Sequence, residues 1–306
     1  MSVPESSRTW RPGRPVDVGA TLGVLRRGGG DPAHQGTADG AVWRTSRTPD
    51  GPATLRLVVR RAEGTVQAQA WGPGAAWVLE GVPALLGAED DLLGFAARHR
   101  VVADAWTANP GWRVPRTRRV MEALVPAILE QKVTGAEARR AWRWLLLRHG
   151  EPAPGPAPEG MRVVPTPEQW AHVPSWDWHR AGVEGVRSRT VVLAARVAAR
   201  LEETVDLPVA DALRRLRAVP GIGRWTAAEV VQRAHGHADE VSYGDFHVAA
   251  WIGWALTGSP VDDDGMMALL EPYAGHRYRV QRLVELSGVR KPRFGPRMSV
   301  KDHRAI

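Results

Sequence analysis

The fold of this chain is decided by the stretch Leu216-Arg217-Ala218-Val219-Pro220-Gly221-Ile222-Gly223-Arg224-Trp225-Thr226-Ala227-Ala228. We expect one helix to end at Pro220 and Gly221 and a second helix to begin near Thr226. The glycines at 221 and 223 permit positive φ and a tight hairpin. The free N–H groups at the start of the second helix form a site for an anion such as phosphate. An ordinary hairpin between two helices, for which one glycine is enough, is the alternative.

Asp245 follows this hairpin in the segment Ser242-Tyr243-Gly244-Asp245-Phe246-His247-Val248. It precedes an apolar helix, predicted over residues 246–256, that carries Val248, Ile252 and Leu256. Aspartate is a frequent N-cap of helices, so a capping role explains this residue if it is taken alone. The combination with the hairpin is what points beyond a cap.

Together the two motifs resemble the helix-hairpin-helix DNA glycosylases, in which such a hairpin and its helix are followed by an aspartate that opens the next helix. Within that superfamily the sequence most resembles DNA-3-methyladenine glycosylase II. Further matching segments are Ala127-Ile128-Leu129-Glu130-Gln131-Lys132-Val133, Arg187 with the helix after it, residues 213–218 and residues 275–279. The resemblance is weak before residue 120 and strong over residues 120–288.

The resemblance assigns chemistry to two residues. Asp245 would stand beside the anomeric carbon as the catalytic carboxylate and stabilise an oxocarbenium-like transition state. Trp225 would line the base pocket and stack on the flipped base. In relatives that also cleave the strand, a lysine takes the place of Trp225 and forms a Schiff base with the sugar. The resemblance therefore implies an enzyme without lyase activity.

A DNA-binding surface is implied as well. Phosphate would bind at the hairpin, which contributes Gly221, Gly223, Arg224 and Thr226. The minor groove would be entered by the loop Gln131-Lys132-Val133, where relatives place an apolar wedge and this chain has lysine. The alkyl stem of Lys132 would fill the gap in the base stack and its amine would reach a phosphate, or the side chain faces solvent without a role.

Two further features concern the pocket and a bound ion. Glu229 and Glu285 stand where the relatives often carry pocket aromatics. The two carboxylates favour a cationic base if they face it, and they have no such role if they face solvent. No cofactor is required, but the resemblance implies a structural monovalent cation, Na⁺ or K⁺, at the backbone carbonyls of Arg217, Val219 and Gly221.

The composition is consistent with a polyanionic partner, since the net charge is +8 and the pI about 10.7. Lysine occurs only at Lys132, Lys291 and Lys301, so a GC-rich coding bias toward arginine explains the charge equally well. The absence of cysteine excludes disulfides, a thiol nucleophile and a cysteine-held iron–sulfur cluster. Because no apolar run is long enough for a membrane span and no secretory leader is present, we expect a cytoplasmic, nucleoid-associated protein.

The chain is expected to be mainly α with a small β-rich N-terminal domain, an α+β class. We expect a disordered tail over residues 1–14, a β-rich domain over 15–87, a helical helix-hairpin-helix region over 88–289 and a basic tail over 290–306. Strands are predicted at residues 41–43, 55–59 and 66–71. Helices are predicted at residues 90–98, 120–128, 136–147, 187–201, 209–218, 226–235, 246–256, 263–270 and 277–286.

The function that the resemblance implies is that of a monofunctional DNA glycosylase acting in base excision repair. It would hydrolyse the N-glycosidic bond of flipped alkylated purines, of the 3-methyladenine and 7-methylguanine type, and leave an abasic site. Its partner would be double-stranded DNA containing damaged bases, bound by a monomer. A glycosylase for another lesion, such as a deaminated base, and a helix-hairpin-helix DNA-binding protein without chemistry are the alternatives.

Overall fold

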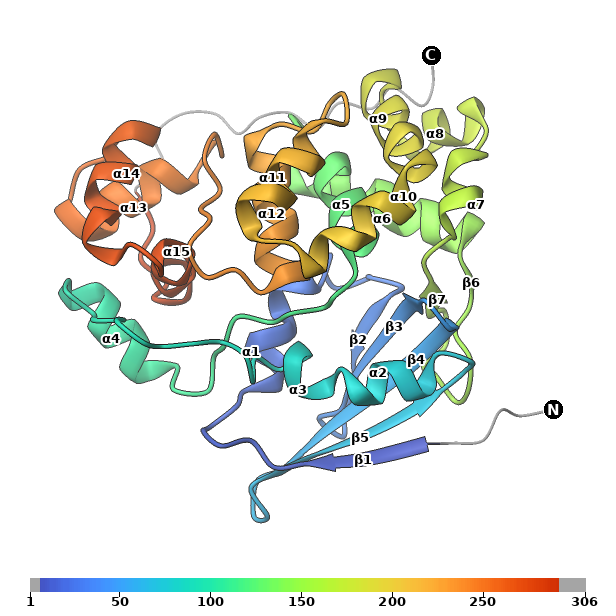
Figure 1. The fold of residues 1–306 in the computed structure, drawn as a ribbon, viewed down its shortest axis with the longest axis horizontal. Coiled ribbons are helices and arrows are strands. Elements are labelled where there is room, and N and C mark those ends of the chain that lie inside the picture. The colour runs from blue at the N-terminus through green and yellow to red at the C-terminus, as the bar shows by residue number, and fades with distance from the viewer. Residues whose placement is uncertain (1–5, 292–306) are drawn as a thin grey trace.

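The computed structural model describes residues 6–291 and consists of an N-terminal sheet followed by a helical body (Figure 1). The sheet is antiparallel, with five strands in the order β1-β5-β4-β3-β2. Its strands are β1 (Ser6–Trp10), β2 (His34–Gly36), β3 (Val42–Thr48), β4 (Gly51–Arg60) and β5 (Thr65–Trp71). The predicted α+β class is thereby confirmed.

The hairpin predicted from residues 55–59 and 66–71 is also confirmed, because β4 pairs with β5 with Leu57 opposite Ala68. The disorder predicted for residues 1–14 is wrong for residues 6–10. These residues form β1, which pairs along the free edge of β5 from Ser6 opposite Ala70 to Trp10 opposite Val66. Ladder hydrogen bonds to a neighbouring strand stabilise the segment although its sequence has little apolar alternation.

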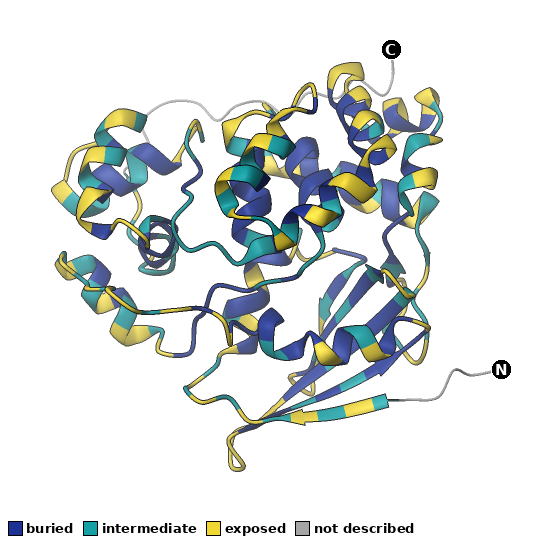
Figure 2. Ribbon diagram, in the orientation of Figure 1, coloured by how far each residue is buried: buried dark blue, intermediate teal, exposed yellow. Residues whose placement is uncertain are grey.

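One face of the sheet is covered by α1 (Val18–Leu22), α2 (Ala75–Glu80) and α3 (Val82–Leu85). The apolar core between them includes Leu22, Leu55, Leu57, Leu79 and Val82. Figure 2 shows buried residues along the sheet and on the inward sides of the helices. A two-stranded pair, β6 (Glu151–Pro152) and β7 (Arg162–Val163), comes from the helical part of the sequence, and β7 contacts β3 and β4.

The helical body contains two apolar cores. The first core is built around α5 (Val120–Leu129), in which every residue except Glu122 is buried. Buried side chains of seven further helices also belong to this core: α6 (Gly135–His149), α7 (Pro167–Ala171), α8 (Ser175–Ala181), α9 (Gly185–Arg196), α10 (Ala198–Glu202), α11 (Val209–Arg217) and α12 (Arg224–Val230). The second core joins α4 (Arg100–Ala108), α13 (Val248–Thr257), α14 (Asp263–Leu270) and α15 (Arg277–Leu286). In Figure 1, the last three of these form a group beside α11 and α12.

Several predicted helix bounds differ from the structure. The helix expected over residues 226–235 is α12 followed by a π-helical turn, η3 (Val231–His235). The helix expected over residues 187–201 is divided into α9 and α10. Short 3₁₀ turns are η1 (Gly23–Leu25), η2 (Glu203–Asp206) and η4 (Glu271–Tyr273). No helix within residues 6–291 is long and apolar enough to cross a bilayer.

The helix predicted over residues 90–98 is wrong, because tertiary contacts hold this segment in an irregular conformation. Asp90 forms a bidentate ion pair with Arg279 of α15, at 2.5 and 3.0 Å, and both side chains are almost completely buried. Arg279 also donates to the carbonyl of Asp91. Gly94 has φ +80, which a helix does not allow. The basic tail expected over residues 290–306 lies outside the described residues from residue 292 onward.

Glu122 attaches the sheet to the helical body. Its carboxylate accepts hydrogen bonds from Arg44 Nη2 at 2.6 Å, Ser46 Oγ at 2.6 Å and the backbone N–H of Arg47 at 2.7 Å. The side chains of Arg44 and Glu122 are 11% and 6% exposed, so the ion pair is buried. Loss of one partner of such a pair leaves the other charge without compensation.

We predict that Glu122→Ala lowers the free energy of unfolding by about 3–5 kcal/mol, the usual cost of removing one partner of a buried ion pair. Urea unfolding followed by circular dichroism measures this loss. Glu159→Ala, at an exposed position, is the matched control and should leave the midpoint unchanged. Equal midpoints for the two variants would show that Glu122 does not hold the sheet in place.

Candidate functional site

The predicted hairpin connects α11 to α12, and Gly221 is the residue that makes it possible. Its φ is +91, and a Cβ at this position would lie 2.1 Å from Thr190 Oγ1 of α9. Gly221 is therefore required both by its backbone conformation and by the close packing of α9. Gly223 differs from the expectation, since its φ of −90 is ordinary and no atom lies within 4 Å of where its Cβ would be.

The N-terminus of α12 carries no side-chain cap, because its N-cap residue is Gly223. The N–H groups of Arg224, Trp225 and Thr226 belong to the first turn, where a helix offers no carbonyl partners. These donors and the positive end of the helix dipole suit an anion.

Gln131 connects the predicted groove-entering loop to this hairpin. The loop lies between α5 and α6, and the Nε2 group of Gln131 donates to Gly221 O at 3.0 Å and to Thr226 Oγ1 at 2.8 Å. Three residues predicted to bind DNA are thus brought together, although Gln131 acts here as a brace of the hairpin.

Lys132 is exposed at the tip of the same loop, and its φ is +54. This left-handed conformation is uncommon for residues other than glycine, and it costs free energy that the surrounding structure must offset. The preceding helix end is held by buried Arg187, whose Nη1 donates to Leu129 O at 2.8 Å. Val133 is partly buried beside it. The strained conformation directs a single cationic side chain outward beside the hairpin.

Trp225 and Asp245 are in direct contact. The indole Nε1–H of Trp225 donates to Asp245 Oδ2 at 3.1 Å. The other carboxylate oxygen, Oδ1, accepts from the backbone N–H groups of His247 at 2.8 Å and Val248 at 3.2 Å. Asp245 therefore holds the backbone just before α13, which begins at Val248 rather than at residue 246 and has His247, not Asp245, as its N-cap. One carboxylate thus contacts both the backbone before α13 and the hairpin helix α12.

The Asp245 turn lies where the chain passes from the first helical core to the second. Trp225 is on α12 of the first core, whereas Val241 and Val248, on either side of the turn, belong to the second. Arg224 adds a second link across this boundary, with its guanidinium carbon 3.7 Å from the centroid of the Tyr243 ring. The carboxylate is half-buried between the two cores.

Sequence reasoning missed a group of aromatic side chains beside Asp245. Phe246 is 87% exposed and meets His247 edge to face, with ring centroids 4.8 Å apart. His247 stacks on Trp251, with ring centroids 5.3 Å apart. The guanidinium carbon of Arg290 lies over the Trp251 ring, 5.1 Å from its centroid. The run of two ring side chains directly after Asp245 was the available signal. Exposed rings of this kind suit stacking on bases.

Glu229 and Glu285 both have cationic partners. Glu229 is buried, pairs with Arg233 Nη1 at 2.8 Å and accepts a hydrogen bond from Ser242 Oγ at 2.6 Å. Glu285 pairs with Arg282 and accepts from Gln281 Nε2 at 3.2 Å. The two carboxylates therefore add polarity near the site without adding net negative charge. Neither is the free solvent-facing side chain that was one of the two expectations.

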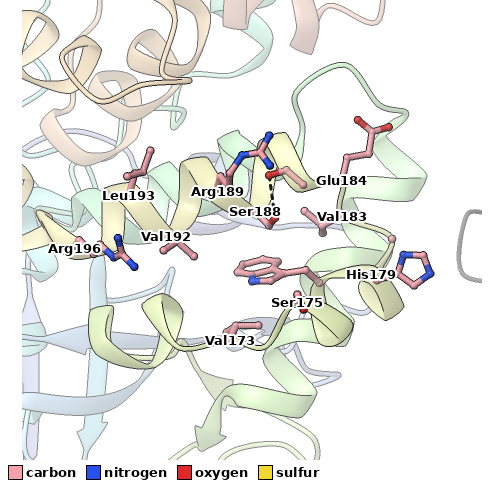
Figure 3. Close-up of a pocket in the computed structure, with 13 residues that line it drawn as sticks. Val173, Ser175, His179, Val183, Glu184, Ser188, Arg189, Val192, Leu193 and Arg196 are labelled. Atoms are coloured by element: carbon pink, nitrogen blue, oxygen red, sulfur yellow. Dashed lines mark hydrogen bonds between the residues drawn. The ribbon is translucent and has the colours of Figure 1, made fainter.

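A surface cavity of about 750 Å³ lies between α8 and α9 (Figure 3). It is lined by apolar side chains such as Val183, Val192 and Leu193, with Arg189 and Arg196 around it. None of its lining residues belongs to the hairpin or to the Asp245 turn. We therefore place the candidate site at the Trp225–Asp245 contact, where the charged and hydrogen-bonding groups converge.

Comparison with known proteins was made for sequence and for structure. The chain matches no family model. It is 32% identical over 171 residues to a probable bifunctional transcriptional activator/DNA repair enzyme AlkA of Mycobacterium tuberculosis. That match covers 54% of this chain and only 31% of the relative, so the chain spans less than a third of the protein that it matches.

Similar folds occur in solved DNA glycosylases. A 3-methyladenine DNA glycosylase from Archaeoglobus fulgidus superposes with a TM-score of 0.75 at 15% identity, covering 92% of this chain and 98% of that one. An 8-oxoguanine glycosylase/lyase from Clostridium acetobutylicum gives a TM-score of 0.70 at 11% identity, with 94% and 99% covered. At these identities the likeness concerns the fold. The chain therefore has the fold of the helix-hairpin-helix DNA glycosylase superfamily and, over about half its length, a sequence similar to that of AlkA.

Proposed function

We propose that this chain is a monofunctional DNA glycosylase that hydrolyses the N-glycosidic bond of flipped alkylated purines, of the 3-methyladenine and 7-methylguanine type, and leaves an abasic site. The observation that carries the proposal is the 3.1 Å hydrogen bond from Trp225 to Asp245, next to a helix start with free N–H donors. The similarity to a DNA repair enzyme and to solved glycosylases supports it.

Asp245 supplies the chemistry in this proposal. As the bond between the sugar and the base breaks, positive charge develops at the anomeric carbon, and a fixed carboxylate stabilises that charge. Its position is set by three donors, the indole of Trp225 and two backbone N–H groups, so little reorganisation is needed. An N-alkylated purine carries positive charge and leaves as a neutral base, so no strong general acid is required.

In this proposal the hairpin binds the DNA backbone. A phosphate beside the lesion would accept from the N–H groups of Arg224, Trp225 and Thr226, without contact to a base. The carbonyls of Arg217, Val219 and Gly221 suit a monovalent cation, and a second lone pair of Gly221 O is left after its bond to Gln131. Such an ion would add positive charge at the phosphate.

The proposed lack of lyase activity rests on the same site. A Schiff base requires a lysine amine beside the anomeric carbon, and Trp225 stands at the corresponding place. The only lysines within residues 6–291 are Lys132, in the loop after α5, and Lys291, beyond α15. The product would be an unbroken strand with an abasic site.

Two alternatives compete with this proposal. A glycosylase for a deaminated or other neutral base is favoured by the paired charges of Glu229 and Glu285, because these two carboxylates then add no net negative charge to attract a cationic base. A DNA-binding module without chemistry would not need Asp245 to contact the hairpin helix, so the indole–carboxylate bond argues against it.

Asp245→Asn is the direct test of the proposed catalytic role. The amide oxygen can still accept the hydrogen bonds from the N–H groups of His247 and Val248, so the fold and DNA affinity should be retained. We expect release of methylated purines from methylated duplex DNA to fall by ~10²–10³ or more, because a key electrostatic stabiliser is lost. Asp50→Asn, on an exposed turn of the sheet, is the control. Excision by Asp245→Asn at the wild-type rate would remove Asp245 from the mechanism.

Trp225→Phe separates stacking from positioning of the carboxylate. The ring is kept but the N–H donor to Asp245 Oδ2 is removed, and a hydrogen bond to a charged group contributes about 1.5–3 kcal/mol. We expect single-turnover base release to fall about 10- to 100-fold, with affinity for abasic DNA changed little. An unchanged rate would mean that the indole N–H does not position the carboxylate.

Lys132→Ala and Lys132→Met test the groove-entering loop. If the lysine stem fills the gap left by a flipped base, the alanine variant should lose affinity for abasic-analogue DNA more than for undamaged duplex. The methionine variant keeps an apolar stem and should retain most of that difference. Equal losses on both DNAs would indicate a phosphate contact only, and no loss would indicate a solvent-facing side chain.

A further inference from the structure

A set of interacting polar side chains lies between α12, the segment before Asp245 and α15. It consists of Glu229, Arg233, Ser242, Tyr278, Gln281, Arg282 and Glu285, which we call the polar cluster. Ser242 is its centre. The Ser242 hydroxyl donates to Glu229 and accepts from Gln281 Nε2 at 3.0 Å, and Gln281 Oε1 accepts from the Ser242 N–H at 3.0 Å.

The polar cluster is joined to the Trp225–Asp245 site from two sides. On one side, Glu229 follows Trp225 by one turn of α12, and Ser242 precedes Asp245 by three residues. On the other side, both terminal nitrogens of Arg290 lie 3.3 Å from the carbonyl oxygen of Glu285, while its guanidinium covers Trp251. Trp251 stacks on His247, two residues after Asp245. The carboxylate of Glu285 is itself connected to this region through Gln281, which also donates to Ser242, three residues before Asp245.

The polar cluster is not saturated by its own members. The Tyr278 side chain is 1% exposed, and its hydroxyl has no hydrogen-bond partner within the described residues. It lies within electrostatic reach of Arg233, Arg282, Glu285 and Glu229, and burial raises the pKa of this phenol, so that it remains a donor. Buried polar groups without partners are rare in native proteins. The open end is formed by Arg282 and Glu285, whose side chains are each 20% exposed.

We propose that the polar cluster receives the edge of the flipped base and that Glu285 makes the enzyme prefer guanine-derived lesions to adenine-derived lesions. This inference rests on the proposed glycosylase function and goes beyond it by naming the substrate class. Stacking on aromatic rings distinguishes bases poorly, because every base has a π face. Hydrogen bonds to the base edge distinguish them well.

The preference follows from the donors and acceptors on each base. A guanine edge presents the ring N1–H and the exocyclic amino group side by side, and one carboxylate accepts from both. An adenine edge presents an amino donor next to the ring N1 acceptor, and the lone pair of that acceptor would face the carboxylate. A glutamine amide at the same place has one acceptor and one donor, which matches adenine.

Glu285→Gln is the corresponding test, with Glu159→Gln at an exposed position as the control. The substrate is duplex DNA treated with a methylating agent, and single-turnover release of 7-methylguanine and of 3-methyladenine is measured on the same sample. We expect the ratio of 7-methylguanine release to 3-methyladenine release to fall about 10-fold in Glu285→Gln, the size expected for one bidentate pair. Glu159→Gln should behave as wild type.

Other outcomes overturn the inference in distinguishable ways. A parallel fall in both rates would show that Glu285 has only a structural role, and an unchanged ratio would show that it does not contact the base. Glu285→Asp keeps both acceptors and should keep the preference even if the absolute rates fall, so its loss there would also contradict the inference. Release of neither base by the wild-type protein would overturn the proposed function itself, and this inference with it.

Discussion

The hydrogen bond between the Trp225 indole and the Asp245 carboxylate joins the two helical cores at the point where chemistry is proposed. Trp225 stands in the first turn of α12, whose free N–H groups suit a phosphate. Asp245 opens α13 and is held by that helix's own backbone. A carboxylate placed in this way has a fixed position relative to the start of α12, and electrostatic catalysis requires such a fixed position.

Buried ion pairs keep the surrounding parts in place. Asp90 and Arg279 attach the segment after the sheet to α15, and Glu122 attaches β3 to α5. Gln131 braces the hairpin from the loop that carries Lys132. The cavity between α8 and α9 lies apart from the proposed site, since none of its lining residues belongs to the hairpin or to the Asp245 turn (Figure 3).

Local motifs made part of this structure predictable from the sequence. The hairpin at Gly221 depends on residues close together in the chain and was predicted, whereas the helix after Asp245 begins three residues later, with His247 as its N-cap. Contacts between distant residues were not predicted. Gln131 and Gly221 are far apart in sequence, and no periodicity indicates that one braces the other. β1 depends on the free edge of β5, and the irregular segment at Asp90 depends on Arg279.

The polar side chains of the site show the same limit. The sequence comparison assigned Glu229 and Glu285 to the base pocket, where two free carboxylates would favour a cationic base. In the structure each is paired with an arginine, Arg233 or Arg282, so the two carboxylates add no net negative charge. Each arginine is only one helical turn from its glutamate, so spacing alone allowed the pairs. Whether those side chains face solvent or a shared interior is set by how α12 and α15 each meet the segment before Asp245, at Ser242. That arrangement is a property of the whole fold.

A structure of the protein bound to duplex DNA that contains a cationic pyrrolidine in place of one nucleotide tests the central claim most directly. Such a sugar analogue imitates the charge of the transition state and should be bound tightly by a glycosylase. The account predicts that the ring nitrogen lies within hydrogen-bond distance of an Asp245 carboxylate oxygen, with a neighbouring phosphate on the N–H groups of Arg224 to Thr226. An analogue that remains stacked in the duplex, or a DNA backbone that does not touch the hairpin, would contradict it.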